Sequence, residues 1–254
     1  MVKPRVVAAF AGFTLLLAGC STGGAEQAQG ERTVTVLAAA SLTESFDELA
    51  GRFEAENPGV RVQLDYAGSS TLVEQLTQGR RADVFASADG KNMAKATAAG
   101  VTGGEPQVFA TNELTIAVPK GNPEHIASLA DLNAPGRLVV QCAPQVPCGS
   151  AARTVEQAAG LRINAASEEN DVKSVLRKVT AGEADAGLVY VTDAKAAAGQ
   201  VQAVDFPEAQ RAINDYPIAS LKDAPEPELG ARFLDYVRGP VGEEVLTAHG
   251  FGTE

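Results

Sequence analysis

Residues 33–39 read TVTVLAA, and these β-branched and apolar residues predict a strand. A helix is predicted directly after this strand, and it ends at Asn57-Pro58-Gly59. Its apolar residues recur at spacings of three and four, as one face of a helix requires; they are Leu42, Phe46, Leu49 and Phe53. The fold therefore begins with a strand and a helix, the repeating unit of an α/β protein.

The same alternation continues along the rest of the chain. Further strands are predicted at residues 61–66, 83–87, 113–118, 138–141, 186–191 and 201–206. Further helices are predicted up to Gly79, up to Gly100, and at residues 150–159, 172–181, 192–198 and 227–249, the last with a break at Gly239-Pro240. Short connections between strand, helix and strand predict a mainly parallel sheet with helices on both faces.

Two segments, residues 105–120 and 214–221, each lead from one α/β block to another. They predict two lobes, one formed by residues 32–114 with 217–254 and the other by residues 115–216. The predicted fold class is therefore α/β, with mixed, mostly parallel sheets and helices on both faces, divided into two lobes. A single doubly wound domain is the alternative.

The first twenty residues have the order of a secretory signal peptide. Lys3 and Arg5 are basic, residues 6–18 form a short apolar run, and the segment ends in Leu17-Ala18-Gly19-Cys20. This ending resembles the lipobox at which bacterial signal peptides are cut and the cysteine is lipid-modified. We expect a lipoprotein signal at residues 1–20, lipid on Cys20 and a flexible tether at residues 21–31. The protein would then be extracytoplasmic and anchored to the cell membrane; a retained transmembrane anchor is the alternative, although the run is short for one.

Composition and charge narrow the function further. Apolar residues make up 45% of the chain and charged residues 21%, which is ordinary for a globular protein. The formal net charge is −11, which argues against nucleic-acid binding because that requires a basic face. A small anion is not excluded, since local dipoles govern a small site more than net charge does.

Two cysteines remain if Cys20 carries lipid. Cys142 and Cys148 form an even pair in a chain predicted to lie outside the cytoplasm, which favours a disulfide over two free thiols. A metal site is disfavoured because His125 and His249 lie far away in the sequence, without the spacing of metal ligands.

Serine-rich turns follow the first two predicted strands. Ser41-Leu42-Thr43-Glu44 fits the capping-box pattern, and Gly68-Ser69-Ser70-Thr71 is followed by Glu74. Helix starts of this kind present backbone N–H groups and a helix dipole that favour an anion. Each motif alone is more typical of a simple helix cap, but two consecutive ones in one lobe indicate an anion site.

The second predicted lobe offers similar helix starts. Pro147-Cys148-Gly149-Ser150 and Asn170-Asp171-Val172 each open a helix, and Tyr190 closes an apolar strand. By pattern alone Tyr190 is better explained as a core aromatic residue. Val172 has no reactive side chain, so its only possible contribution is a main-chain N–H.

Together these motifs resemble the periplasmic molybdate-binding proteins of ABC transporters, over nearly all of residues 33–252. The resemblance is carried by AAASLT at residues 38–43, AGSSTL at 67–72, ADVFASAD at 82–89, PCG at 147–149, ENDV at 169–172, GLVY at 187–190, FLDYV at 233–237, Gly239-Pro240 and Gly250-Phe251. It implies a type II periplasmic-binding-protein fold that holds an oxyanion between its lobes through hydrogen-bond donors alone, with no direct bond from protein to metal. Carried over by motif, the donors are Ser41, Ser69, Cys148, Val172 and Tyr190.

The resemblance also implies the partners of this protein. Molybdate would be its ligand, and tungstate, which is nearly the same size, would bind as well. An ABC permease with its ATPase would receive the anion. We expect no cofactor, no enzymatic activity, no nucleic acid and a monomeric protein.

Cys148 departs from the resemblance, because the family more often has alanine at this position. Since a bridge to Cys142 would hold the loop that donates to the anion, our hypothesis is that the disulfide shapes this loop before binding. Three rival functions stay open. They are a receptor for sulfate or another ligand on the same fold, an adhesin or signalling lipoprotein, and a serine hydrolase that uses Ser41 or Ser69. The hydrolase lacks a nearby histidine and a G-x-S-x-G motif.

Overall fold

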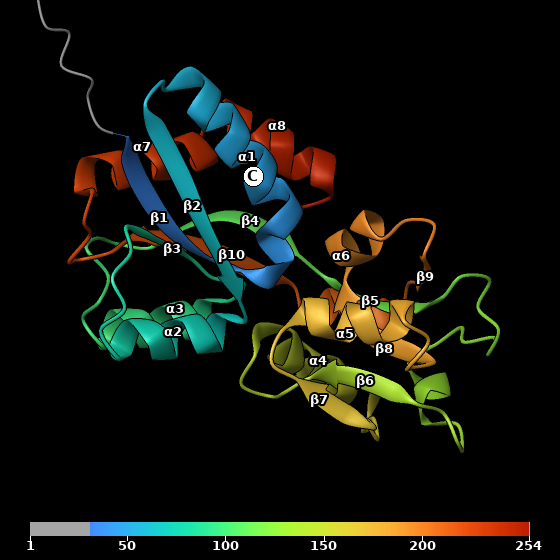
Figure 1. The fold of residues 1–254 in the computed structure, drawn as a ribbon. Coiled ribbons are helices and arrows are strands. Elements are labelled where there is room, and N and C mark those ends of the chain that lie inside the picture. Colours follow the sequence, from blue (N-terminus) through green and yellow to red (C-terminus); the bar gives the residue numbers. More distant parts are fainter. Residues whose placement is uncertain (1–30, 254) are drawn as a thin grey trace, which may run out of the picture. The chain divides into compact units, whose positions relative to one another are not determined.

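A computed structural model describes residues 31–253 of the chain (Figure 1). The predicted signal peptide, the lipidation site Cys20 and the tether up to residue 30 lie outside the described residues. Two five-stranded sheets organise residues 31–253. In that part of the chain, no helix combines the length and the apolar character that a membrane span requires.

The first sheet has the strand order β2-β1-β3-β10-β4. Its first three strands are parallel, whereas β10 is antiparallel to both of its neighbours. The strands are β1 (Arg32–Ala39), β2 (Val60–Ala67), β3 (Val84–Ala86), β4 (Gln107–Asn112) and β10 (Asn214–Ser220).

The second sheet repeats this plan in the order β7-β6-β8-β5-β9. Strands β7, β6 and β8 are parallel, and β5 is antiparallel to both β8 and β9. The strands are β5 (Leu114–Pro119), β6 (Val139–Cys142), β7 (Ser167–Glu169), β8 (Ala186–Tyr190) and β9 (Val201–Val204). The chain passes from the first sheet to the second between β4 and β5 and returns between β9 and β10.

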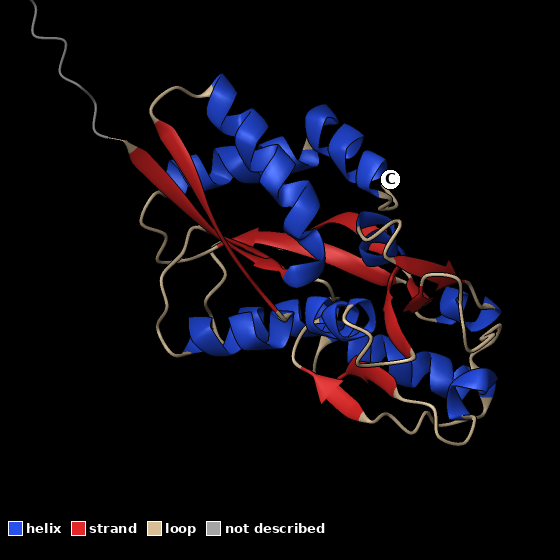
Figure 2. Cartoon of the chain, turned by 45° about the vertical axis from the view of Figure 1, so that its right-hand side comes forward, coloured by secondary structure: helices blue, strands red, loops and turns tan. Residues whose placement is uncertain are grey.

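Helices flank the strands of both sheets (Figure 2). We call the first sheet with its helices the first half. These helices are α1 (Thr43–Glu56), α2 (Ser69–Thr77), α3 (Gly90–Ala98), α7 (Pro227–Arg238) and α8 (Pro240–His249). The second half is the second sheet with α4 (Pro147–Ala159), α5 (Val172–Thr180) and α6 (Val191–Ala196). Short 3-10 turns are η1 (Ala40–Leu42), η2 (Ala130–Asn133) and η3 (Pro207–Arg211).

Strand β1 is buried on both of its faces. Val34 and Val36 join a cluster that contains residues of α1, α7 and α8, whereas Leu37 joins a cluster that contains residues of α2 and α3. Successive side chains of a strand point to opposite faces, so an uninterrupted apolar run suits a strand covered on both sides. The core of the first half therefore forms two layers around its sheet, while the second half has one main cluster.

The predicted strands and helices are present with small differences at their ends. The segments interpreted as connections, residues 105–120 and 214–221, also contain the paired strands β4 and β10, and the short strand β7 was not predicted. Helix α4 begins at Pro147 rather than Ser150, because proline suits the first position of a helix, where no N–H bond is required.

The two halves contact each other at several polar positions. Lys91 Nζ of the first half lies 2.6 Å from Ser150 Oγ of the second, and Lys195 Nζ of α6 donates to the carbonyl oxygen of Ala248 at 2.8 Å. Lys173 Nζ, at the start of α5, lies 2.7 Å from both carboxylate oxygens of Glu44 on α1.

Lys173 also lies beside a fully buried carboxylate. Asp193 is 0% exposed, and its Oδ1 is 3.1 Å from Lys173 Nζ in an ion pair without hydrogen-bond alignment. Its Oδ2 accepts the backbone N–H of Tyr190 at 3.2 Å. Burial raises the pKa of Asp193, and the charge of Lys173 opposes that rise. Lys173 is therefore the cation that allows Asp193 to stay ionised in the interior.

We predict that Lys173→Met lowers the free energy of unfolding by about 3–5 kcal/mol at pH 7, because it leaves Asp193 buried without its cation. A buried carboxylate whose pKa is raised by folding takes up a proton as the pH falls, and the cost of its buried charge to stability then disappears. The loss should therefore shrink between pH 7 and pH 5 in urea unfolding. Glu44→Gln, which removes a partly exposed partner, should cost about 1 kcal/mol or less.

A double variant that carries Lys173→Met and Asp193→Asn separates the effect of the lost charge from the effect of the lost packing. It should recover most of the stability, because the amide has no charge to bury. A pH-independent loss that Asp193→Asn does not reverse would contradict the role of Lys173 as a counter-ion.

Candidate ligand-binding site

Ser41 and Ser69 occupy equivalent positions at one edge of the first sheet. Strands β1 and β2 pair in parallel, with Ala39 opposite Ala67 at their carboxyl ends. Each serine follows its strand by two residues, Ser41 in η1 and Ser69 as the first residue of α2. Parallel pairing therefore brings the two predicted serines to the same edge of the sheet.

The capping-box predictions for these serines are wrong. The N-cap of α1 is Leu42 and that of α2 is Gly68, and neither makes a side-chain cap bond in the described chain. Ser41 lies instead inside the 3-10 turn, where its Oγ is 2.9 Å from Tyr216 Oη. The first N–H groups of α2 have no intrahelical partner, as at every helix start, and no side chain satisfies them.

Ser69 is held by a backbone group. Its Oγ accepts the N–H of Ala88 at 3.0 Å, and the carbonyl oxygen of Ala88 in turn accepts Asn214 Nδ2 at 2.7 Å. Because an N–H only donates, Ser69 Oγ acts as the acceptor in this bond, and its own O–H remains available as a donor.

The second half repeats this arrangement of strands followed by helix starts. Strands β6 and β7 pair in parallel, with Cys142 opposite Glu169. Cys148 is the second residue of α4, and Val172 is the first residue of α5. Both N–H groups belong to the first turn, where no intrahelical acceptor exists. The N-cap of α5, Asp171, uses its carboxylate on the N–H and Oγ of Ser174, both at 2.7 Å.

Cys142 and Cys148 form the predicted disulfide, which links the last residue of β6 to the first turn of α4. The loop between them is tightly closed. A Cβ on Gly149 would lie 2.0 Å from the carbonyl oxygen of Ala143, so glycine is required there. The bridge therefore spans the loop that presents the Cys148 N–H.

Tyr190 ends β8, and its side chain is 1% exposed. Its Oη has no hydrogen-bond partner among the described residues, although it is completely buried. An unpaired buried hydroxyl is costly and unusual in a folded protein. Burial raises the pKa of Tyr190 well above its ordinary value, so the hydroxyl remains a donor at neutral pH.

The segments that carry the predicted donors of the first half contact those of the second half. A Cβ on Gly68 would lie 2.0 Å from the carbonyl oxygen of Asn170 and 3.5 Å from Val146 Cγ1. Gly68 directly precedes Ser69, while Val146 and Asn170 each precede a predicted donor of the second half by two residues.

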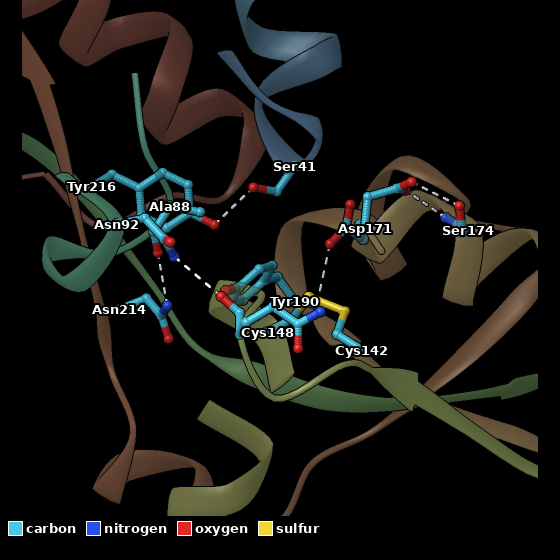
Figure 3. The surroundings of a disulfide bond; sticks show 12 residues. Ser41, Ala88, Asn92, Cys142, Cys148, Asp171, Ser174, Tyr190, Asn214 and Tyr216 are labelled. Atoms are coloured by element: carbon cyan, nitrogen blue, oxygen red, sulfur yellow. Dashed lines mark hydrogen bonds between the residues drawn. A yellow bond between two sulfur atoms is a disulfide. The ribbon is translucent and has the colours of Figure 1, made fainter. Parts of the chain in front are cut away.

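The aromatic rings of Tyr190 and Tyr216 lie 6.0 Å apart, and Tyr216 reaches Ser41 (Figure 3). The structure therefore brings the predicted site residues to one buried contact, where each is at most 4% exposed: Ser41, Ser69, Cys148, Val172 and Tyr190.

A groove of about 580 Å³ lies beside this contact, and both halves line it. Ala40 and Asp171, the direct neighbours of Ser41 and Val172, are among its lining residues, together with Lys173 and Arg177. In residues 31–253, no three His, Cys, Asp or Glu side chains come together as a metal site. The arrangement therefore offers hydrogen-bond donors to a small anion, with no set of ligands for a bare cation.

Sequence reasoning missed Tyr216 and Asn112. Tyr216 is fully buried on β10, and its Oη accepts Asn112 Nδ2 at 3.4 Å. Both residues lie in segments interpreted as connections, so no strand pattern drew attention to them. The dipeptide Tyr216-Pro217 is the one local signal, because a proline within a strand marks an irregularity such as a bulge.

The chain matches the family model for bacterial extracellular solute-binding proteins over residues 34–252. It is 49% identical over 223 residues to the molybdate-binding protein ModA of Mycobacterium tuberculosis, a match that covers 88% of this chain and 85% of that protein.

Two solved structures share the fold. The periplasmic molybdate-binding protein of Azotobacter vinelandii has a TM-score of 0.75 at 22% identity, over 87% of this chain and 99% of that chain. The sulfate-binding protein SubI of Mycobacterium tuberculosis has a TM-score of 0.78 at 18% identity, over 87% of this chain and 86% of that chain. The chain thus belongs to the family of bacterial extracellular solute-binding proteins and has a periplasmic-binding-protein fold.

Proposed function

We propose that this protein captures molybdate, and tungstate as well, and delivers it to an ABC permease and its ATPase. One observation carries the proposal. Donors from two neighbouring strand ends in each half, together with an unpaired tyrosine hydroxyl, are buried at a single contact. The molybdate-binding relative, 49% identical along most of its length, supports molybdate as the anion.

The proposed ligand bonds come from uncharged groups. Ser41, Ser69 and Tyr190 would donate through hydroxyls, and Cys148 and Val172 through main-chain N–H groups. A hydrogen bond to an ionised partner contributes about 1.5–3 kcal/mol, so several of them hold a dianion without arginine or lysine. Helix starts add a favourable dipole at α2, α4 and α5.

A shell made only of donors selects among oxyanions by protonation. Hydrogen phosphate carries an O–H, and in this proposal all five groups of the shell donate, so none of them accepts that hydrogen. That O–H would be left unpaired, at a cost of about 1–3 kcal/mol. Sulfate carries no proton at neutral pH, so only the size of the cavity can exclude it.

Binding would couple to closure of two lobes, residues 32–114 with 217–254 and residues 115–216. An anion that bonds both lobes stabilises the closed form through contacts absent from an open form. The closed form is what the permease would recognise. In this proposal the protein works as a monomer without catalysis or cofactor, outside the cytoplasm, held to the membrane by lipid on Cys20.

Sulfate is the second candidate ligand. The sulfate-binding protein SubI has the same fold with a TM-score of 0.78. The fold alone therefore does not separate the two anions, and a direct competition must do so.

We predict that calorimetric titration of the purified protein detects molybdate and tungstate binding and little phosphate binding. Ser41→Ala and Ser69→Ala should each weaken molybdate binding about 10- to 100-fold, because each removes one charge-assisted bond. Ser128→Ala is the matched control, because it removes a serine hydroxyl that is not among the proposed donors. Ser128 Oγ donates to Asp131 Oδ2 of η2 at 2.9 Å. Absence of molybdate binding, or tighter sulfate binding in competition, would overturn the proposal.

We predict that Gly68→Ala weakens molybdate binding at least about tenfold. The new Cβ would collide with the carbonyl oxygen of Asn170, so it opposes contact between the halves. Gly68 has φ −61° and ψ 139°, which alanine adopts freely, so backbone strain is not the cause. Gly51→Ala is the control, because nothing in the described chain lies within 4 Å of its added Cβ. Equal affinity for both variants would show that the contact at Gly68 is not needed for binding.

We also expect that the disulfide shapes the loop that donates the Cys148 N–H. Reduction verified by thiol counting, or the double change of Cys142 and Cys148 to serine, should weaken molybdate binding by freeing that loop. The measurement is the same titration under oxidising and reducing conditions. Unchanged affinity after complete reduction would remove this role.

A further inference from the structure

Tyr216 connects the predicted donor Ser41 to a chain of buried polar groups. Its side chain is 0% exposed, and its Oη lies 2.9 Å from Ser41 Oγ (Figure 3). Either hydroxyl could donate in that pair when it is considered alone. The direction matters, because Ser41 can donate to an anion only if its own hydrogen is not already used on Tyr216.

The amide of Asn112 fixes the direction of these hydrogen bonds, because it lies at the other end of the series of polar groups. Its Oδ1 accepts the backbone N–H of Glu113 at 3.0 Å, so the amide orientation is set and Nδ2 faces inward. Nδ2 donates to Thr192 Oγ1 at 2.8 Å and to Tyr216 Oη at 3.4 Å. An amide nitrogen has two hydrogens and no acceptor site, so Tyr216 Oη must act as the acceptor in this bond.

The rest of the direction follows from the hydroxyls. Among the described residues, the hydrogen-bond partners of Tyr216 Oη are Asn112 Nδ2 and Ser41 Oγ, and of these only Ser41 Oγ can accept a hydrogen. A buried hydroxyl hydrogen without an acceptor is costly, so the hydrogen of Tyr216 points to Ser41 Oγ. Ser41 receives that hydrogen, and its own O–H is left to point at a ligand. Hydrogen bonds in such a chain strengthen one another when they all run the same way.

We propose that Tyr216 is a positioning residue that makes Ser41 an obligate hydrogen-bond donor to the bound oxyanion. This inference rests on the proposed function and deepens it. Tyr216 acts on the anion through Ser41. Asn112, whose amide is also bonded to Thr192, donates to Tyr216 Oη and so leaves the Tyr216 hydrogen for Ser41. The hydrogen bonds start at Asn112 Nδ2, which donates to Thr192 of the second half and to Tyr216, and Tyr216 donates to Ser41 of the first half.

The fold holds the Tyr216 ring rigidly. The pairing of β10 with β4 shifts register between Tyr216 and Pro217, and such bulges re-aim side chains next to functional sites. The ring then packs edge-on against Phe251 at 5.4 Å and Tyr190 at 6.0 Å between centroids. Tyr216 therefore has little freedom to turn its hydroxyl away from Ser41.

Ser69 shows why Ser41 needs such a partner. Ser69 Oγ accepts the backbone N–H of Ala88, a group that can only donate. Ser41 has a rotatable hydroxyl as its partner, which must itself be oriented. The two serines reach the same donor state, one through the main chain and the other through Tyr216 and Asn112.

The test is a double-mutant cycle on the full protein, with the molybdate dissociation constant as the readout. Tyr216→Phe should weaken binding about fivefold to tenfold, which is the range for one lost hydrogen bond. In a Ser41→Ala background, the same change should alter the constant less than about twofold, because the residue through which Tyr216 acts is gone. Tyr236→Phe is the control, since its Oη bonds Glu56 Oε1 at 2.8 Å away from the contact.

The outcomes separate this inference from the proposed function. A wild-type protein that binds no molybdate overturns the proposed function and this role together. A wild-type protein that binds molybdate, with equal losses from Tyr216→Phe in both backgrounds, overturns only the role of Tyr216. If Tyr216→Phe weakens binding only in the protein that retains Ser41, and Tyr236→Phe leaves binding unchanged, the role of Tyr216 is established.

Discussion

Parallel strand pairing is the constraint on which the candidate site depends. A helix that follows a parallel strand begins at the carboxyl edge of the sheet, and its first N–H groups have no partner within the helix. Ala39 opposite Ala67 and Cys142 opposite Glu169 fix two such edges, one in each half. Because the edges meet at Gly68 and Asn170, the proposed site draws donors from four neighbouring strand ends. In that site no ligating charge is required, since serine and tyrosine hydroxyls and main-chain N–H groups are the donors.

Charged side chains that lie beside those donors have partners within the protein. Asp193 is fully buried, yet Lys173 lies beside it and also reaches Glu44 in the other half. The carboxylate of Asp171 accepts hydrogen bonds from the N–H and the Oγ of Ser174 in the first turn of α5. Asp193 is thus balanced by a cation, and Asp171 is stabilised by the hydrogen bonds that it accepts.

The sequence was most informative where a strand ends in a serine-rich turn. The periodic pattern of the chain predicted the strand before Ser41 and the helix after it, and likewise for Ser69, so the positions could be foreseen from local pattern. Their bonding could not, because both capping boxes were wrong and the true partners lie far away, at Tyr216 and Ala88. Val172 offers only a main-chain N–H, and only a family resemblance could single it out. Tyr216 was hidden because it lies on the interior strand β10, which is buried almost throughout and interrupted by a bulge, and so lacks the alternation that marks a strand.

Strand order in the first sheet has a consequence for biosynthesis. Strand β4 pairs only with β10 in that sheet, and β10 is made after all five strands of the second sheet. The second half is one continuous segment, so its sheet can be complete as soon as β9 has emerged. Strand β4 must wait for residues 214–220 while its edge remains open, and unpaired edges promote aggregation. The risk of misassembly is therefore greater in the first half, whose sheet is begun first and completed last.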